Sequence, residues 1–294
     1  MKQIMHLAIV LCVTAVCGVS AALAQSSPFV SGVQAPAWVE RSGVLQPLQA
    51  GASLATGDRL STGKDARVIL AMPDESTVKL GEQVQFEIRD LQSAQAEQPF
   101  RGFLRVLAGA FRYTTLAAGK AKSRQLDIQV GTATIGIRGT DVWGKSGPHQ
   151  DLVCLIEGKI EITRAGATPV PMQEALSVYT ATPKQPADPL SKIEVPKLQV
   201  LALETELTQG QGVMQADGKY AAYIYSVRNP AEAERYRKQL RQDGYAAEIY
   251  TAEVNDQTWQ RVAIPYFATA ADARTVGARL EKLYNIDDTW VGKF

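Results

Sequence analysis

The chain ends, from Tyr220 to Phe294, with YAAYIYSVRNPAEAERYRKQLRQDGYAAEIYTAEVNDQTWQRVAIPYFATAADARTVGARLEKLYNIDDTWVGKF. Asn229-Pro230 predicts the start of a helix, because asparagine caps a helix and proline suits its first turn. Thr269 is expected to cap a second helix. Apolar and aromatic runs too short for helices predict strands at four places, residues 220–227, 245–254, 258–267 and 289–294. The stretch therefore predicts an α+β fold with the order βαββαβ, which is RNP-like.

Two helices cover only one face of a four-stranded sheet, so alternate strand residues are expected to divide between a buried and an open face. The expected buried set is Ala222, Ile224, Ala247, Ile249, Val262, Ile264 and Val291. The expected open set is Tyr223, Tyr225, Glu248, Tyr250, Trp259, Arg261 and Trp290. A solvent-facing aromatic patch of this size is typical of a binding site. The alternative is that the linker or a neighbouring domain covers it.

The order of elements, together with Trp259-x-Arg261 and the opening YAAYIYSV before Asn229, resembles the SPOR domain over the whole of residues 220–294. SPOR domains are small bacterial modules that bind peptidoglycan. Two departures from the family are Tyr223, where the family usually has glutamine, and Pro265-Tyr266, where it has Gly-Pro. The resemblance implies a peptidoglycan-binding face, and the residues predicted to form it are Tyr223, Tyr225, Ser226, Tyr250, Trp259, Arg261 and Trp290.

The first residues of the chain predict export. Residues 1–24 combine Lys2, an apolar stretch from about Ile4 to Val19, and the small-x-small sequence Ala22-Leu23-Ala24. These are the features of a cleaved secretory signal peptide. The apolar stretch is shorter than the ~20 residues of a membrane span; the alternative is an uncleaved anchor. We expect a protein of the periplasm or cell envelope of a Gram-negative bacterium, with no integral membrane span after cleavage.

The composition of the chain excludes further classes of function. The chain has 31 basic and 30 acidic residues, and the segment 220–294 has ten of each. Such a balance gives no electrostatic reason to bind nucleic acid. Removal of residues 1–24 leaves Cys154 as the one cysteine, in the apolar run LVCLI, where it is expected to be a small buried hydrophobe.

The N-terminal half, residues 29–182, is a series of short strands separated by glycine, proline and aspartate, which predicts a mainly-β domain. It resembles the FecR domain, a β-rich periplasmic module. The residues that carry the resemblance are Gly51, Gly57-Asp58, Thr62-Gly63, Val106 to Gly109, Ile137 to Thr140 and Glu157-Gly158. In the regulator that names the family, this domain senses a partner receptor and is tied to a membrane helix. We expect this domain to engage an unidentified envelope protein or a polysaccharide.

The block Ile137-Arg138-Gly139-Thr140-Asp141 allows two interpretations. Arg138 could grip an acidic ligand, with Asp141 nearby. In the structural interpretation, Gly136 and Gly139 allow a tight bend or bulge, and Arg138 pairs with Asp141 or with a carboxylate such as Glu157.

Residues 183–219 are predicted to be a linker. It opens with the proline-rich run 183–189, has a possible short helix within 196–209 that could pack on either domain, and is expected to loosen again at Gln209-Gly-Gln-Gly212.

The residue inventory does not favour catalysis. After export the chain keeps one histidine, His149, and one cysteine, and neither a nucleophilic triad nor the Cys/His clusters of a zinc site are apparent. We therefore predict a non-enzymatic, two-domain protein without a cofactor or metal: a mainly-β FecR-like domain followed by an α+β SPOR-like domain that binds peptidoglycan glycan strands. The alternatives are an RRM-like nucleic-acid-binding module and a glycan-cleaving envelope enzyme.

Overall fold

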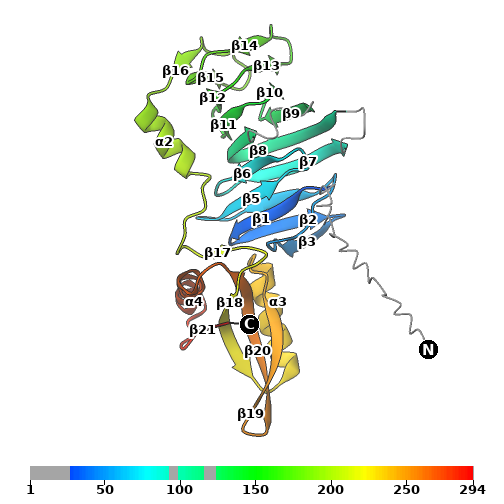
Figure 1. Ribbon diagram of the computed structural model, residues 1–294, viewed down its shortest axis with the longest axis vertical. Helices are drawn as coiled ribbons and strands as arrows, with labels where there is room; N and C mark the ends of the chain where they lie inside the picture. Colours follow the sequence, from blue (N-terminus) through cyan, green and yellow to red (C-terminus); the bar gives the residue numbers. More distant parts are fainter. Residues whose placement is uncertain (1–26, 93–98, 116–123, 294) are drawn as a thin grey trace, which may run out of the picture.

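The structure is a computed structural model, and it describes residues 27–92, 99–115 and 124–293. The predicted signal peptide, residues 1–24, lies outside the described residues, as does Phe294. The chain is mainly β, as the sequence predicts, with three helices among the described residues (Figure 1).

Two sheets, antiparallel except for one parallel pair, form a sandwich between Phe29 and Lys192. The first sheet, sheet A, contains in spatial order β16 (Ser191–Lys192), β15 (Ser177–Ala181), β12 (Asp151–Glu157), β11 (Asp141–Ser146), β8 (Phe100–Thr115), β6 (Ser76–Leu80), β5 (Arg67–Ala71) and β1 (Phe29–Gln34). The second, sheet B, contains β3 (Val44–Pro47), β2 (Ala37–Arg41), β4 (Arg59–Thr62), β7 (Gln85–Gln92), β8, β9 (Arg124–Val130), β10 (Ala133–Ile137), β13 (Ile160–Arg164) and β14 (Val170–Met172).

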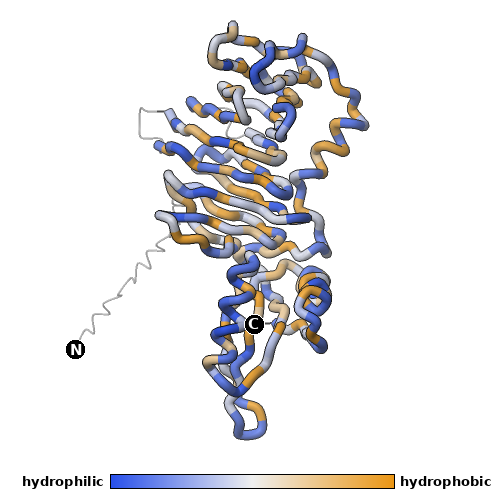
Figure 2. The backbone as a smooth tube through the Cα atoms, turned by 180° about the vertical axis from the view of Figure 1, so that it is seen from behind, coloured by the Kyte–Doolittle hydropathy of each residue, from blue (hydrophilic) through white to orange (hydrophobic). Residues whose placement is uncertain are grey.

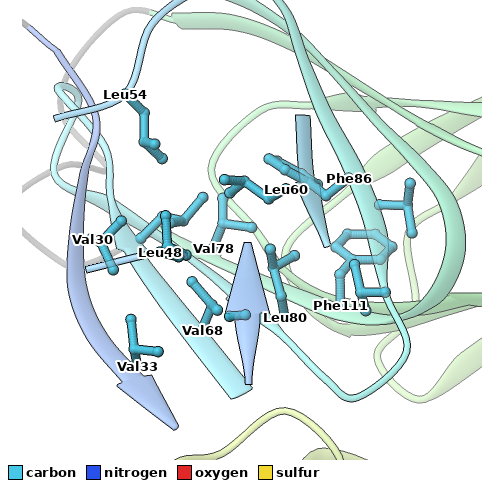
Figure 3. Close-up of a cluster of buried hydrophobic side chains, with 14 of the residues drawn as sticks. Val30, Val33, Leu48, Leu54, Leu60, Val68, Val78, Leu80, Phe86 and Phe111 are labelled. Carbon is cyan, nitrogen blue, oxygen red and sulfur yellow. The ribbon is translucent and has the colours of Figure 1, made fainter. Parts of the chain in front are cut away.

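Strand β8 belongs to both sheets, because its first half pairs with β7 and, in parallel, with β9, while its second half pairs with β6 and β11. Alternate residues of each strand point into the space between the sheets, and the alternation of hydropathy along the strands is visible in Figure 2. Figure 3 shows the resulting core, to which sheet A contributes Val30, Val68, Val78, Leu80 and Phe111, and sheet B contributes Leu60 and Phe86.

Helix α2 (Val195–Leu203) packs on the sandwich (Figure 1). Its Leu198 joins a cluster with Trp143 and Cys154 on the outer side of sheet A. Burial raises the pKa of the Cys154 thiol to about 11, so the thiol stays neutral at physiological pH, in line with the expected apolar role. Directly after the helix, Glu206 pairs with Lys79 on β6 at 2.6 Å. The predicted short helix is thus an outer layer of the sandwich.

The glycine-containing turn after α2 is tight, and the expectation that it loosens the chain is wrong. Gly210 and Gly212 have φ of +83° and +98°, and this conformation turns successive backbone N–H groups toward the side chain of Asp272. The next segment, β17 (Val213–Met214), pairs with β1 of the sandwich and, at Met214, with Phe267 in the C-terminal sheet. The two parts of the chain are therefore joined by continuous strand pairing.

Residues 220–293 contain, in order, β18 (Tyr220–Val227), α3 (Pro230–Gln242), β19 (Glu248–Val254), β20 (Gln257–Phe267), α4 (Ala270–Tyr284) and β21 (Trp290–Lys293). The spatial order of the antiparallel strands is β19, β20, β18, β21. The side chain of Asn229 accepts a hydrogen bond from Ala231 N at 2.9 Å, and Thr269 Oγ1 accepts one from Asp272 N at 3.1 Å, so both predicted caps form. None of the described helices is both long and apolar enough to cross a membrane.

The residues that carry the resemblance to the FecR domain shape the sandwich. Gly139 lies between β10 in sheet B and β11 in sheet A and has φ of +82°, as the predicted bend requires. A Cβ on Gly158 would lie 2.7 Å from the carbonyl oxygen of Gly139, so the Arg-Gly-Thr and Glu-Gly blocks meet in space. This close approach gives a physical reason for Gly158, and the positive φ gives one for Gly139.

Gly139→Val is expected to lower the free energy of unfolding of the sandwich by about 1–3 kcal/mol, because a β-branched residue strongly disfavours positive φ. No atom lies within 4 Å of the position that a Cβ would take, so the effect comes from the backbone conformation alone. Gly139→Asn is the matched control, since asparagine tolerates this conformation. Urea unfolding checks both variants, and equal midpoints for Val and Asn would contradict the backbone argument.

Candidate functional site: the open face of the C-terminal sheet

Helices α3 and α4 cover one face of the C-terminal sheet and leave the other face open. The predicted buried residues Ala222, Ile224, Val262 and Ile264 are at most 3% exposed, and they belong to the core that the helices close. Ala247 is buried in the same core, and Ile249 and Val291 pack against it. The predicted division of the sheet into two faces therefore holds for this whole set.

Strand register arranges the open face as three cross-strand rows. The first row runs across the sheet through Trp290, Tyr223, Ala263 and Glu248. The second row consists of Ser226, Arg261 and Tyr250, and the third contains Trp259 and Ala252. Residues paired in register share a face. The open face accordingly holds six of the seven predicted site residues.

Tyr225 is the exception, and its predicted place on the open face is wrong. The register of β18 against β20 shifts between Tyr223 and Tyr225, where a β-bulge lets two residues of β18 oppose one of β20. The bulge turns Tyr225 to the helix side, where its ring stacks on Tyr236 of α3 with centroids 3.9 Å apart. It then returns Ser226 to the open face, opposite Arg261.

Three aromatic rings of the first two rows contact one another. Tyr223 stacks on Trp290, with centroids 5.0 Å apart and an interplanar angle of 6°, and meets Tyr250 edge-on at 6.4 Å. Tyr223 is only 9% exposed, whereas Trp290 is 37% exposed. Tyr223 is thus a support beneath the patch, and Trp290 offers the accessible ring.

Arg261 lies beside this aromatic cluster and has no ion-pair partner among the described residues. Its guanidinium carbon is 5.7 Å from the centroid of the Trp290 ring. Its Nε is buried and makes no hydrogen bond to any described residue. A buried donor without a partner is unfavourable and uncommon in proteins. The side chain as a whole is partly exposed, so its terminal guanidinium nitrogens can meet an oxygen-bearing ligand.

Trp259 lies further along the same face, near the β19–β20 turn. The guanidinium carbon of Arg228 is 5.0 Å from the centroid of its ring. Arg228 was not among the predicted site residues, because it follows the last residue of β18 and only the strand register brings it to Trp259. Trp259 and Arg228 form a second cation–aromatic pair, separate from the cluster around Tyr223.

The sandwich reaches one end of the open face without covering Trp290. Gln49 Nε2 donates to Glu248 Oε1 at 3.3 Å, and Tyr250 Oη donates to Glu248 Oε2 at 2.8 Å. Burial, reinforced by this hydrogen bond to a carboxylate, raises the pKa of Tyr250, so its hydroxyl remains protonated. This hydrogen bond from the sandwich reaches the first row at Glu248, and the ring of Trp290 remains exposed.

In the N-terminal half, the structure separates Arg138 from Asp141. Asp141 pairs with Arg112 of β8 at 2.7 Å on sheet A. Arg138 is exposed beside sheet B and has no ion-pair or hydrogen-bond partner among the described residues. The predicted pairing of Arg138 with Asp141 or Glu157 is therefore wrong, because the bend at Gly139 sends the two ends of the block to different sheets. No group of three or more potential metal ligands occurs in the described part of the chain.

Comparisons with known proteins agree with both resemblances. The family model of the SPOR domain matches residues 216–291, and that of the FecR protein matches residues 58–161. Both predicted resemblances, to the FecR protein in the N-terminal half and to the SPOR domain at the C-terminal end, are confirmed; the matched segments are called the FecR module and the SPOR domain below. No curated protein matches the sequence.

Two crystal structures of a candidate anti-sigma factor from Parabacteroides distasonis ATCC 8503 are similar to the chain at 11% identity and a TM-score of 0.41. The similarity covers 80% of this chain and 98% or 97% of the other. A likeness this distant carries no inference about function.

Proposed function

We propose that this is an exported, non-enzymatic cell-envelope protein that binds peptidoglycan glycan strands through the open face of its SPOR domain. One observation carries the proposal: Arg261, without an ion-pair partner among the described residues, lies beside the accessible ring of Trp290 on the face that the helices leave open. An indole ring can lie against the apolar face of a sugar, and a guanidinium can bind amide or carboxylate oxygens. Peptidoglycan offers all of these groups.

The FecR module, on this proposal, engages a second envelope component, either a protein or a polysaccharide. The continuous pairing through β17 and the contact between Gln49 and Glu248 support a fixed arrangement of the two modules. A wall-bound SPOR domain would then hold the FecR module at a defined orientation. The charge balance of residues 220–294, ten basic and ten acidic, gives no electrostatic reason to bind nucleic acid.

Co-sedimentation of residues 25–294 with purified Gram-negative sacculi tests the proposal. We expect the protein to sediment with intact sacculi and with sacculi stripped of stem peptides, because the Trp290 ring and the Arg261 guanidinium are proposed to contact the glycan. Cellulose is the control polymer, since it offers sugar faces without N-acetyl groups. Failure to sediment with either sacculus preparation would overturn the proposal. Release of soluble muropeptides during incubation would instead indicate the glycan-cleaving alternative.

A further inference from the structure

A groove of about 1010 Å³ with charged, polar and apolar lining residues lies on the outer face of sheet B, away from the SPOR domain's open face. Strands β9, β10, β13 and β14 contribute to it, and it includes Arg138 and Gly139 of the FecR motif. Its lining contains no aromatic side chain. Neutral sugars are commonly bound against aromatic rings, so this lining suits a ligand that is recognised by its charges.

Gly136 forms the floor of the groove. It is paired in register with Asp127 on one side and with Glu161 on the other. Neighbouring strands are about 4.8 Å apart, so the two carboxylate side chains flank a position that has no side chain of its own. A Cβ at Gly136 would lie 3.7 Å from Asp127 Oδ1. The groove is therefore hollowed at one residue, with a carboxylate on each side.

The charges in the groove are not paired with one another. Asp127 and Glu161 make no hydrogen bond or ion pair with any described residue, and burial raises the pKa of Asp127. Arg138 and Lys159, which line the same groove, likewise have no partner in the described part of the chain. Arg138 directly follows β10 and Lys159 directly precedes β13, so each lies two residues from the row of Gly136. Two residues of extended chain span about 6.6 Å. The groove thus presents two carboxylates in one row and two cations about 6.6 Å along the chain from it.

We propose that this groove binds a diamino-acid residue, with the side-chain ammonium between Asp127 and Glu161 and the free α-carboxylate at Arg138 and Lys159. An extended lysine-type side chain places these two groups about 6–7 Å apart, given C–C bonds of about 1.5 Å. This matches the spacing of the two rows. The proposal deepens the partner-binding role proposed for the FecR module and does not depend on glycan binding by the SPOR domain.

Two sources offer this chemistry, a protein that ends in lysine and a diamino-acid stem peptide. The first probe is acetyl-Ala-Ala-Lys with a free carboxylate, and the second is L-Ala-γ-D-Glu-meso-diaminopimelate. NMR titration of residues 25–294 is expected to show saturable binding of at least one of them. Amidation of the carboxylate or acetylation of Nζ should weaken the peptide roughly tenfold, the effect of losing one charge-assisted contact. The tighter probe identifies the source.

Three groove variants and one control variant test where the ligand binds. Asp127→Asn and Arg138→Gln should each weaken binding about tenfold, whereas Asp90→Asn, an exposed carboxylate on β7 outside the groove, should not. Gly136→Ala should bind more weakly while folding at least as stably, because a Cβ there meets only ordinary contacts and alanine loses less entropy. Equal affinities for the free and blocked probes, or absence of saturable binding by either free probe, would overturn the proposal. So would unchanged binding by all three groove variants.

Discussion

Arg261→Ala is expected to weaken binding of the chain to sacculi about ten- to a hundredfold, the loss that follows removal of a charged donor worth roughly 1.5–3 kcal/mol. The structure gives two reasons for a large effect. Arg261 is partly exposed and has no ion-pair partner among the described residues, so the terminal N–H groups of its guanidinium can donate to a ligand oxygen. The guanidinium also lies 5.7 Å from the Trp290 ring, where one ligand can contact both groups.

Two further substitutions separate this role from general charge effects. Arg261→Lys keeps the positive charge but loses the planar fork, so most of the affinity should still be lost if the fork is what binds. Arg235→Ala removes an arginine that is 68% exposed on α3, on the covered side of the sheet, and should leave sedimentation unchanged. Circular dichroism and thermal unfolding establish that the variants fold. If Arg261→Ala and Arg235→Ala sediment alike, Arg261 does not bind the wall.

Local sequence signals predicted the C-terminal fold well because they act over a few residues. Asn229 and Thr269 cap the helices as expected, and residues 220–227 form β18 within the predicted limits. Strand β19 begins at Glu248 and not at Tyr245. The intervening residues are buried after Gly244, where a Cβ would lie 2.7 Å from the Trp38 ring of the sandwich. The approach of Gly244 to Trp38 joins residues about 200 positions apart in sequence, and no local pattern could show it.

The candidate site was predicted less completely, because a side chain's face depends on strand register. Strict alternation places Tyr223 and Tyr225 together, and the bulge between them separates them. Arg228 reaches Trp259 only through the same register. In the sandwich, the motif around Arg138 was recognisable, but its charge partners depend on which sheet each residue enters. Sequence patterns give the residue types of a site, and the pairing of the strands decides which of these residues lie close together.

The linker gives the clearest case of a long-range contact that composition conceals. Gln209-Gly-Gln-Gly212 has the composition of a flexible segment, yet its backbone closes around one carboxylate 60 residues away in sequence. Asp272 Oδ1 accepts hydrogen bonds from the backbone N of Gly210, Gly212 and Val213 at 2.7, 3.0 and 2.9 Å. Oδ2 accepts one from Thr269 Oγ1 at 2.5 Å, and the residue is 0% exposed.

Asp272→Ala is therefore expected to lower the free energy of unfolding by about 3–5 kcal/mol, because it leaves buried backbone donors unsatisfied in place of a fully bonded carboxylate. Asp272→Asn keeps an acceptor for the three N–H groups and should lose only about 1–2 kcal/mol, since its acceptor is uncharged. Asp287→Ala, an exposed carboxylate after α4, is the control and should be neutral. Urea unfolding measures all three changes.

Hydrogen exchange of individual amides shows which part of the chain the substitution loosens. The amides of Gly212 and Val213 should exchange much faster in Asp272→Ala, because loss of their acceptor frees the segment that leads into β17. Strand β17 pairs with β1 and contacts Phe267, so loosening it should also weaken the connection between the FecR module and the SPOR domain. Faster exchange in this segment with an unchanged rate in β5 and β6 would identify Asp272 as the residue that fixes the linker. Unchanged unfolding and exchange would show that the three hydrogen bonds contribute nothing to the fold.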